Sequence, residues 1–99
     1  MKEIDFLPES LEDIVEIELW YDLQKPGLGS EFLINLHNLL SVIRERPNLF
    51  VTVFENFRTA PVKRFPYNVY YQVIESKILI YGVIHNHRSP KVWKNRLNL

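Results

Sequence analysis

The stretch YNVYYQVIESKILIYGVIH, residues 67–85, predicts a β-hairpin and sets the fold class of the C-terminal half of the chain. Residues 67–74 are rich in aromatic and β-branched side chains, and residues 77–85 are almost entirely apolar, as is typical of strands. Only Glu75 and Ser76 separate the two segments, so the connection is a tight turn. We therefore expect two adjacent antiparallel strands.

The second of these strands has an expected buried side and an expected open side. Successive side chains of a strand point to opposite faces of the sheet. Ile78, Ile80 and Ile84 then share one face, which we expect helices to cover. His85 falls on the other, open face, at the end of the strand.

Two helices are predicted before the hairpin. The first helix is predicted to start at Ser10, because Ser10 and Asp13, three residues later, together resemble a capping box. The segment QKPGLG at 24–29 ends this helix. The second ends at Pro47 and has an apolar stripe at helical spacing. That stripe consists of Phe32, Leu33, Leu36, Leu39, Leu40 and Ile43. The short connection predicts that the two helices form an antiparallel hairpin.

The remaining segments complete the order of elements. Residues 3–7 and 57–65 are expected strands, and Pro61 restricts the latter to an edge or a bulge. Residues 48–56 show no regular pattern. The segment SPKVWKNRL at 89–97 predicts a final helix with a serine cap and proline at its first position.

Together these elements predict a single α+β domain over residues 1–99, in the order β-α-α-β-β-β-α. A helix hairpin would cover a largely antiparallel four-stranded sheet. The strand at 57–65 is expected to run opposite to the strand at 3–7, because the helix hairpin between them returns the chain to its starting end. Trp93 is expected to hold the final helix on the sheet.

The composition excludes several kinds of site. The chain has no cysteine, so disulfides and thiolate metal sites are impossible. His85 and His87 share a face, but no third ligand accompanies them, so we expect no metal and no cofactor. The chain also lacks a glycine-rich phosphate loop and a stretch long enough to span a membrane, and its first ten residues lead us to expect no signal peptide. We expect a soluble, cytoplasmic protein without a membrane partner.

The formal net charge is zero, but the two halves of the chain differ in sign. Residues 1–49 hold four basic and ten acidic side chains, whereas residues 50–99 hold eight basic and two acidic ones. A basic face of this kind commonly meets nucleic acid or an acidic protein. The alternative is that two oppositely charged surfaces simply coexist on one soluble domain, which accounts for the same distribution of charge.

The basic half contains the groups that metal-independent RNA cleavage would need. A base takes the 2′-hydroxyl proton, an acid protonates the leaving oxygen, and a cation offsets the charge of the phosphate. Arg64, His85 and Arg88 are the candidate catalytic residues. The alternative is that they have no chemical role, because histidine and arginine are common near the ends of strands.

The element order, with the segments FRTAPVKRFPYNVYYQV and ILIYGVIHNHRSPKVWKNRL, resembles the RelE/ParE superfamily of bacterial toxins, often called plasmid stabilisation proteins. The segment DIVEIELWYDLQKPGLGSEFL is similar to their first helix and loop. The resemblance implies the toxin of a type II toxin-antitoxin pair, which a protein antitoxin holds inactive. RelE-like members cleave mRNA on the ribosome, whereas ParE-like members are associated with inhibition of DNA gyrase and are not nucleases.

Departures from the nuclease pattern favour a ParE-like protein. Asn68 stands where RelE-like enzymes carry a catalytic arginine, and the chain continues to Leu99 without the terminal His-Tyr pair of another nuclease branch. A neutral net charge is also unusual for a toxin that enters the ribosome. We predict a gyrase inhibitor. A ribosome-dependent mRNA interferase and a partner-binding member without toxicity are the alternatives.

The resemblance also implies a surface for the antitoxin, in a toxin-antitoxin hetero-oligomer. Basic and aromatic side chains of the C-terminal half are the candidates for contacts with this partner or with the target. They are Arg58, Lys63, Tyr67, His87, Lys91 and Lys94.

Overall fold

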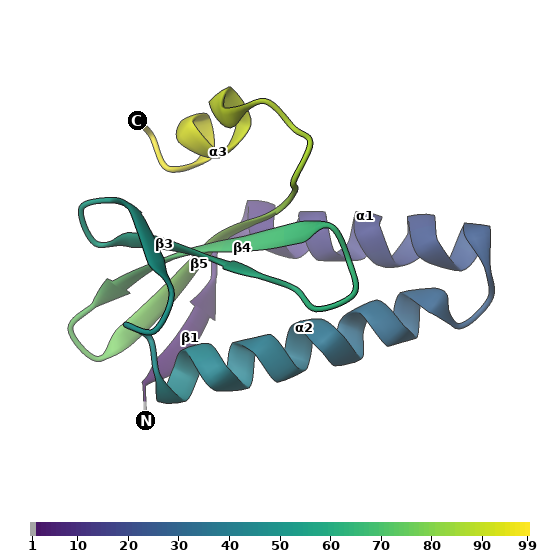
Figure 1. Cartoon of the computed structure of the whole chain (residues 1–99), viewed down its shortest axis with the longest axis horizontal. Coiled ribbons are helices and arrows are strands. Elements are labelled where there is room, and N and C mark those ends of the chain that lie inside the picture. The colour runs from purple at the N-terminus through teal and green to yellow at the C-terminus, as the bar shows by residue number, and fades with distance from the viewer. Residues whose placement is uncertain (1) are drawn as a thin grey trace.

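In the computed structural model, which describes residues 2–99, a five-stranded sheet lies between a hairpin of two long helices and a short third helix (Figure 1). The elements are β1 (Glu3–Phe6), α1 (Pro8–Gln24), α2 (Leu28–Glu45), β2 (Val51–Phe54), β3 (Phe57–Pro61), β4 (Tyr67–Ile74), β5 (Lys77–His85) and α3 (Pro90–Arg96). Within residues 2–99, no helix combines the length and the apolar character needed to cross a membrane.

The strands are arranged in the order β1-β5-β4-β3-β2. Each neighbouring pair is antiparallel except β1 with β5, which is parallel. The predicted α+β class, with a helix hairpin on a largely antiparallel sheet, is therefore confirmed. The β4–β5 hairpin also has the predicted bounds, because Ile74 pairs with Lys77 and leaves only Glu75 and Ser76 in the turn.

The predicted count of four strands is wrong, because residues 51–54 form the additional edge strand β2. This strand has only four residues, Val-Thr-Val-Phe, and none of its side chains is buried, so its pattern is too short to distinguish it from a loop. Residues 51–54 form a strand because they pair with β3, where Val51 faces Thr59. The strand expected at 57–65 is also shorter and ends at Pro61.

The expected direction of the strand at 57–65 is wrong for the same reason. β1 is parallel to β5, and two antiparallel steps through β4 give β3 the direction of β1. The first strand after the helix hairpin is β2, and it is β2 that runs opposite to β1. The helix hairpin does turn the chain back against the direction of β1, but the strand that follows it is β2, which the sequence pattern did not reveal.

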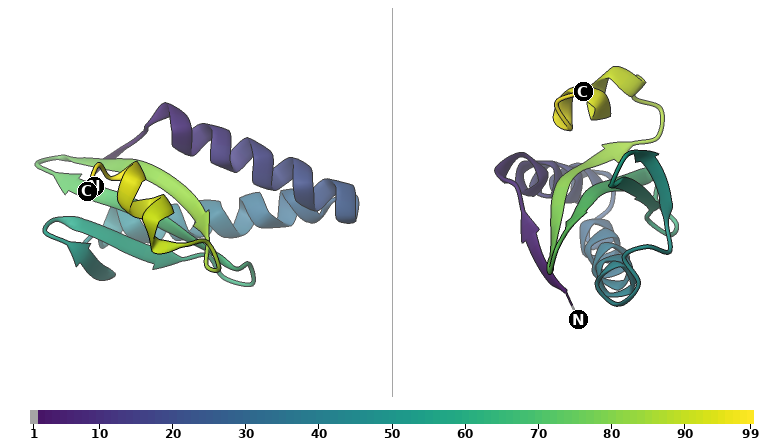
Figure 2. Two further views of the ribbon diagram at one scale, coloured as in Figure 1. Left: turned by 90° about the horizontal axis from the view of Figure 1, so that it is seen from above. Right: turned by 90° about the vertical axis from the view of Figure 1, so that its left-hand side faces the viewer.

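The main core lies between the sheet and the helix hairpin (Figure 2). Ile17 of α1 and the predicted stripe of α2 are buried there against the sheet, where Ile80 is fully buried. The buried members of the stripe are Phe32, Leu36, Leu39 and Ile43. Burial of each such side chain contributes about 1.5–3 kcal/mol to folding, so this layer holds the hairpin in place.

The opposite face of the sheet is covered by α3 (Figures 1 and 2). Trp93 of α3 stacks on Tyr70 of β4, with ring centroids 5.4 Å apart and planes 14° from parallel. Phe57, Ile84 and Leu97 complete this second, smaller core. Trp93 therefore holds the final helix on the sheet, as predicted, and α3 covers part of the sheet face that was expected to be open.

A β-bulge interrupts the alternation of β5. Tyr70 of β4 pairs with Gly82, and the next residue, Tyr71, pairs with Ile80, so Tyr81 is an extra residue on β5. A single extra residue reverses which face the following side chains occupy.

The reversal moves His85 to the side of the helix hairpin, which contradicts the expected open-face position. Beyond Tyr81, Val83 joins the main core and Ile84 joins the core beneath α3, the opposite of the predicted assignment of Ile84. His85 is two positions after Val83 and therefore lies on the same face of the sheet. Its ring meets the ring of Tyr67 edge-on, with the ring centroids 5.0 Å apart. The prediction failed because it assumed an unbroken period of two.

The start of α1 also differs from the prediction. The helix begins at Pro8, and no side chain caps it at Leu7. The buried Ser10 hydroxyl donates a hydrogen bond to the Leu7 carbonyl at 2.7 Å. The predicted capping box of Ser10 and Asp13 is therefore absent, because proline at the first position starts the helix two residues earlier.

Candidate functional site

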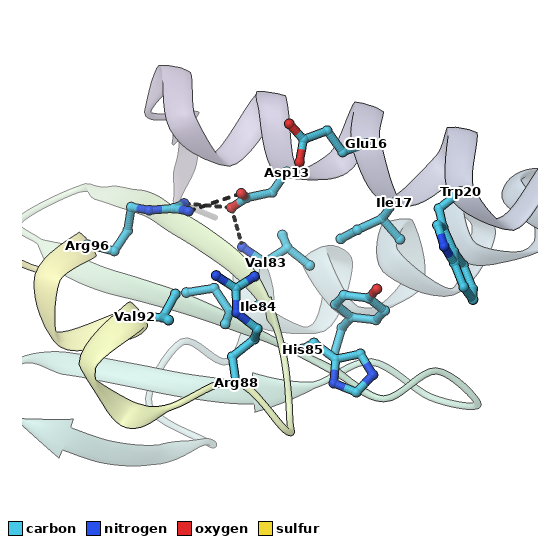
Figure 3. A pocket seen from close by; sticks show the side chains of 11 residues that line it. Asp13, Glu16, Ile17, Trp20, Val83, Ile84, His85, Arg88, Val92 and Arg96 are labelled. Carbon is cyan, nitrogen blue, oxygen red and sulfur yellow. Dashed lines mark hydrogen bonds and ion pairs between the residues drawn. The ribbon is translucent and has the colours of Figure 1, made fainter.

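A pocket of about 230 Å³ lies between α1, the end of β5 and α3, and it brings together His85 and Arg88 (Figure 3). Its lining consists of Asp13, Glu16, Ile17, Trp20, Tyr67, Val83, Ile84, His85, Arg88, Val92 and Arg96. In the part of the chain from residue 2 onward, no three potential metal ligands lie close enough together to hold an ion.

Asp13 and Arg96 form an ion pair in the wall of this pocket, which we call the Asp13–Arg96 clamp. Nη1 of Arg96 lies 2.6 Å from Oδ2 of Asp13, and Nη2 lies 3.1 Å from Oδ1, as in a two-bond guanidinium-carboxylate pair. The Arg96 and Asp13 side chains are only 17% and 16% exposed. Asp13 also accepts the N–H of Val83 at 3.0 Å, and Arg96 donates to the carbonyl of Tyr81 at 3.2 Å. The clamp therefore joins α1, β5 and α3.

The clamp occupies most of the hydrogen-bonding capacity of Arg96. Besides Asp13 and Tyr81, its Nε lies 3.4 Å from a carboxylate oxygen of Glu9. The hydrogen bond to Asp13 raises the pKa of Arg96 above its ordinary value, against the opposing effect of burial. Arg96 is thus a structural cation and not a free binder of a phosphate.

Sequence reasoning did not identify the clamp, because its two residues belong to opposite ends of the chain. Gly82 was the available signal. A Cβ at Gly82 would lie 2.9 Å from Nη1 of Arg96, so the guanidinium passes where another side chain would be. Glycine inside an apolar strand often marks such a close approach.

His85 presents a donor at the end of β5. Its Nδ1 accepts a hydrogen bond from the backbone N–H of His87 at 3.0 Å. A neutral imidazole that accepts at Nδ1 carries its proton on Nε2. In this arrangement His85 offers an N–H group and lacks the free basic nitrogen that a general base requires.

Arg88 and Tyr67 stand beside His85 in the same pocket. Burial raises the pKa of the Tyr67 hydroxyl, and the nearby charge of Arg88 partly offsets this effect. The pocket also contains the carboxylates of Asp13 and Glu16, so its charge is mixed. A lining of this kind would repel parts of a polyanion as well as attract others.

The structure does not bring Arg64 into this pocket. Arg64 lies in the β3–β4 loop with a φ of 71°, and its guanidinium pairs with Glu31 of α2 at 3.1 Å. Arg58 is also engaged elsewhere, because it donates to the carbonyls of Phe50 at 2.6 Å and Asn48 at 3.3 Å. It thereby fastens the segment after α2 to β3.

The other predicted binding residues are spread over separate surfaces. Lys63 lines a groove of about 330 Å³ between α2 and β3. Lys91 and Lys94 lie exposed on α3, with the Lys94 ammonium 5.8 Å from the ring centre of Trp93. His87 is exposed in the loop before α3. Of the nine predicted site residues, only Tyr67, His85 and Arg88 line a common pocket.

Comparison with known proteins identifies the fold. No family model and no curated protein matches the sequence. A chain of the chromosomal ParDE TA system from P. aeruginosa has a TM-score of 0.75 at 15% identity, over 86% of this chain and 96% of that one. The isolated RelE toxin of E. coli has a TM-score of 0.68 at 18% identity, over 99% of this chain and 97% of that one. The predicted RelE/ParE fold is therefore confirmed.

Proposed function

We propose that this protein, which has the fold of the RelE and ParE toxins, is the toxin of a type II toxin-antitoxin pair and acts by binding a cytoplasmic target without cleaving RNA. A cognate protein antitoxin would neutralise it. The observation that carries the choice of binding over cleavage is the covered sheet face, where Trp93 of α3 stacks on Tyr70. That face is the one on which the sequence placed His85, a candidate catalytic residue.

The arrangement of the candidate catalytic residues supports the same choice. Cleavage needs a base, an acid and a cation around one phosphate. Arg64 instead pairs with Glu31, and His85 presents a donor. At the position where the resemblance expects a catalytic arginine, Asn68 donates a hydrogen bond to Asn86 at 2.6 Å.

DNA gyrase is the target that we propose. This part of the proposal rests on the resemblance to ParE-like toxins and on the likeness to the ParDE structure, and not on a particular residue of the chain. The exposed basic residues of α3 and its preceding loop are candidates for contact with the target or with an acidic antitoxin.

A ribosome-dependent mRNA endonuclease is the second candidate function. It is favoured by one observation, the presence of His85, Arg88 and Tyr67 in a single pocket. Rotation of the His85 ring away from His87 would free a basic nitrogen there, and Arg88 would supply the cation.

Two assays on the purified protein distinguish these functions. We expect inhibition of gyrase-dependent supercoiling and intact mRNA on translating ribosomes. Cleavage of mRNA that is lost in His85→Ala and retained in His37→Ala, a change at an exposed histidine of α2, would overturn the proposal in favour of the nuclease. Induced expression in E. coli should also arrest growth. Normal growth with neither activity would reject the toxin assignment and leave a partner-binding protein without toxicity.

A further inference from the structure

The outward side of α1 carries a row of exposed aliphatic side chains. Leu11, Val15, Leu19 and Leu23 recur at every fourth position, so they follow one another along the helix surface. Their exposed fractions lie between 49% for Leu11 and 83% for Leu23. We call this row the α1 ridge. It runs toward the connected end of the helix hairpin, which extends beyond the sheet (Figure 2).

The ridge is additional to the face by which α1 contacts the rest of the protein. Ile14, Ile17 and Tyr21 already belong to the main core. A helix that is apolar on both sides is ordinarily buried on both sides. Contiguous apolar surface of this kind on a soluble protein is characteristic of an interaction site.

The helix that carries the ridge has only acidic charged side chains, of which Glu9 and Asp13 pair with Arg96 of α3. α1 contains six acidic side chains and no lysine or arginine. They are Glu9, Glu12, Asp13, Glu16, Glu18 and Asp22. Glu12 and Glu16 line a shallow depression on the ridge together with Leu11 and Val15. A partner on this surface therefore meets aliphatic groups flanked by carboxylates.

This charge pattern identifies the chemistry of the occupant. A second copy docked symmetrically through α1 would place carboxylates against carboxylates, and opposed like charges disfavour such a dimer. A partner that presents apolar side chains flanked by lysine or arginine would complement both features of the ridge.

We propose that the α1 ridge is the docking site for a basic amphipathic helix of another protein. A helix is the fitting shape, because the ridge extends for about 18 Å along the axis of α1, and an inclined row of side chains on one helix fits the groove between rows on another. Basic side chains of the partner would reach Glu12 and Glu16. The inference does not rest on the proposed function, because it requires neither toxicity nor gyrase binding.

A pair of synthetic peptides tests the proposal with the full-length protein. One is a helix-forming peptide of about 18 residues with a leucine stripe and lysines on its other positions, and the second has glutamate at every lysine position. Trp20 borders the ridge and is exposed, so a change in tryptophan fluorescence can report binding. We expect the basic peptide to bind and the acidic peptide not to bind.

Matched variants locate the binding site. Leu19→Ser should weaken binding of the basic peptide by about tenfold or more, because it removes apolar contact area. Ile34→Ser on α2 should leave binding unchanged, since Ile34 and Leu19 are 60% and 59% exposed. Glu12→Gln should weaken binding and reduce its dependence on salt, whereas Glu45→Gln, at an exposed position on α2, should not.

Three results would overturn the proposal. The first is no binding of the basic peptide, and the second is equal binding of the two peptides. The third is a stable dimer of the protein alone that Leu19→Ser dissociates, because a second copy would then be the occupant of the ridge. Loss of gyrase inhibition or of toxicity would not bear on these measurements, so the two proposals fail separately.

Discussion

The carboxylate of Asp13 and the guanidinium of Arg96 meet across 83 positions of sequence, with N–O distances of 2.6 and 3.1 Å. Asp13 belongs to α1, on one side of the sheet, and Arg96 belongs to α3, on the other (Figure 3). No side chain within Pro90–Arg96 is fully buried. The position of α3 therefore depends on this ion pair together with the stacking of Trp93 and the burial of Leu97.

Replacement of Arg96 in the Asp13–Arg96 clamp should lower the stability of the protein. Arg96→Met leaves the Asp13 carboxylate mostly buried without its countercharge, so we expect the free energy of unfolding to fall by about 3 kcal/mol. Urea unfolding measures the change. The control is Arg64→Met, whose ion pair with Glu31 is mostly exposed and should be worth less than about 1 kcal/mol. Equal losses in the two variants would mean that the clamp is no stronger than a surface pair.

The loss of stability caused by a side chain at Gly82 should depend on the presence of Arg96. Gly82→Ala places a Cβ 2.9 Å from Nη1 of Arg96, which Asp13 holds in place, so we expect a loss of about 1–3 kcal/mol. In the Arg96→Met background the same change should cost much less, because the guanidinium is gone. A double-mutant cycle by urea unfolding measures the coupling. Additive effects would show that the clash does not involve Arg96.

Local patterns in the sequence predicted the parts of the fold that depend on local chemistry. The apolar spacing of residues 32–43 predicted the buried face of α2, and Glu75 with Ser76 predicted the β4–β5 turn. Pro90 and Ser89 predicted the start of α3, where the Ser89 hydroxyl accepts the N–H of Lys91 at 3.3 Å. In each case the residues that determine the element lie within the element or next to it.

The errors came from features that nonlocal contacts decide. The bulge at Tyr81 depends on how β5 pairs with β4, and it reversed the side on which His85 was expected. β2 exists because it pairs with β3. The Asp13–Arg96 clamp needs both ends of the chain, and composition showed these residues only as charges. Of the predicted site residues, Tyr67, His85 and Arg88 line one pocket, and the functional role of each stays a prediction.

A methyl group at Gly29, near the connection of the two long helices, should lower the stability of the protein. A Cβ there would lie 2.5 Å from the backbone oxygen of Glu18 and 2.8 Å from Oδ1 of Asp22, which accepts the N–H of Gly29. The backbone of α1 cannot move aside as a side chain can, so Gly29→Ala should cost about 3 kcal/mol. Gly27→Ala is the control, because its Cβ meets nothing within 4 Å and only its φ of 90° opposes the change. We expect a smaller cost of about 1 kcal/mol there. Thermal unfolding that ranks Gly27→Ala as the more damaging change would contradict the close approach of the helices.

Titration of Tyr71 should make the stability of the protein fall in strongly alkaline solution. Tyr71 is fully buried, and its hydroxyl donates a hydrogen bond to the carbonyl of Pro47 at 2.6 Å. Burial raises the pKa of Tyr71 from 10.0 to about 12, although the charge of Arg58 acts in the opposite direction. Because the unfolded chain loses this proton at lower pH, the contribution of Tyr71 to stability is complete below pH 10.0 and declines as the pH rises toward about 12. The decline should amount to roughly 2–3 kcal/mol.

Comparison with Tyr71→Phe separates this effect from the titration of other groups. At neutral pH the variant should be less stable by about 1 kcal/mol, because it lacks the hydrogen bond to Pro47. Between pH 10.0 and about 12 the difference should shrink and then reverse, since phenylalanine has no proton to lose. Chemical unfolding of both proteins over this range measures the difference. A constant difference in stability would mean that the Tyr71 hydroxyl has the same pKa in the folded and unfolded chains, and hence that burial does not raise it.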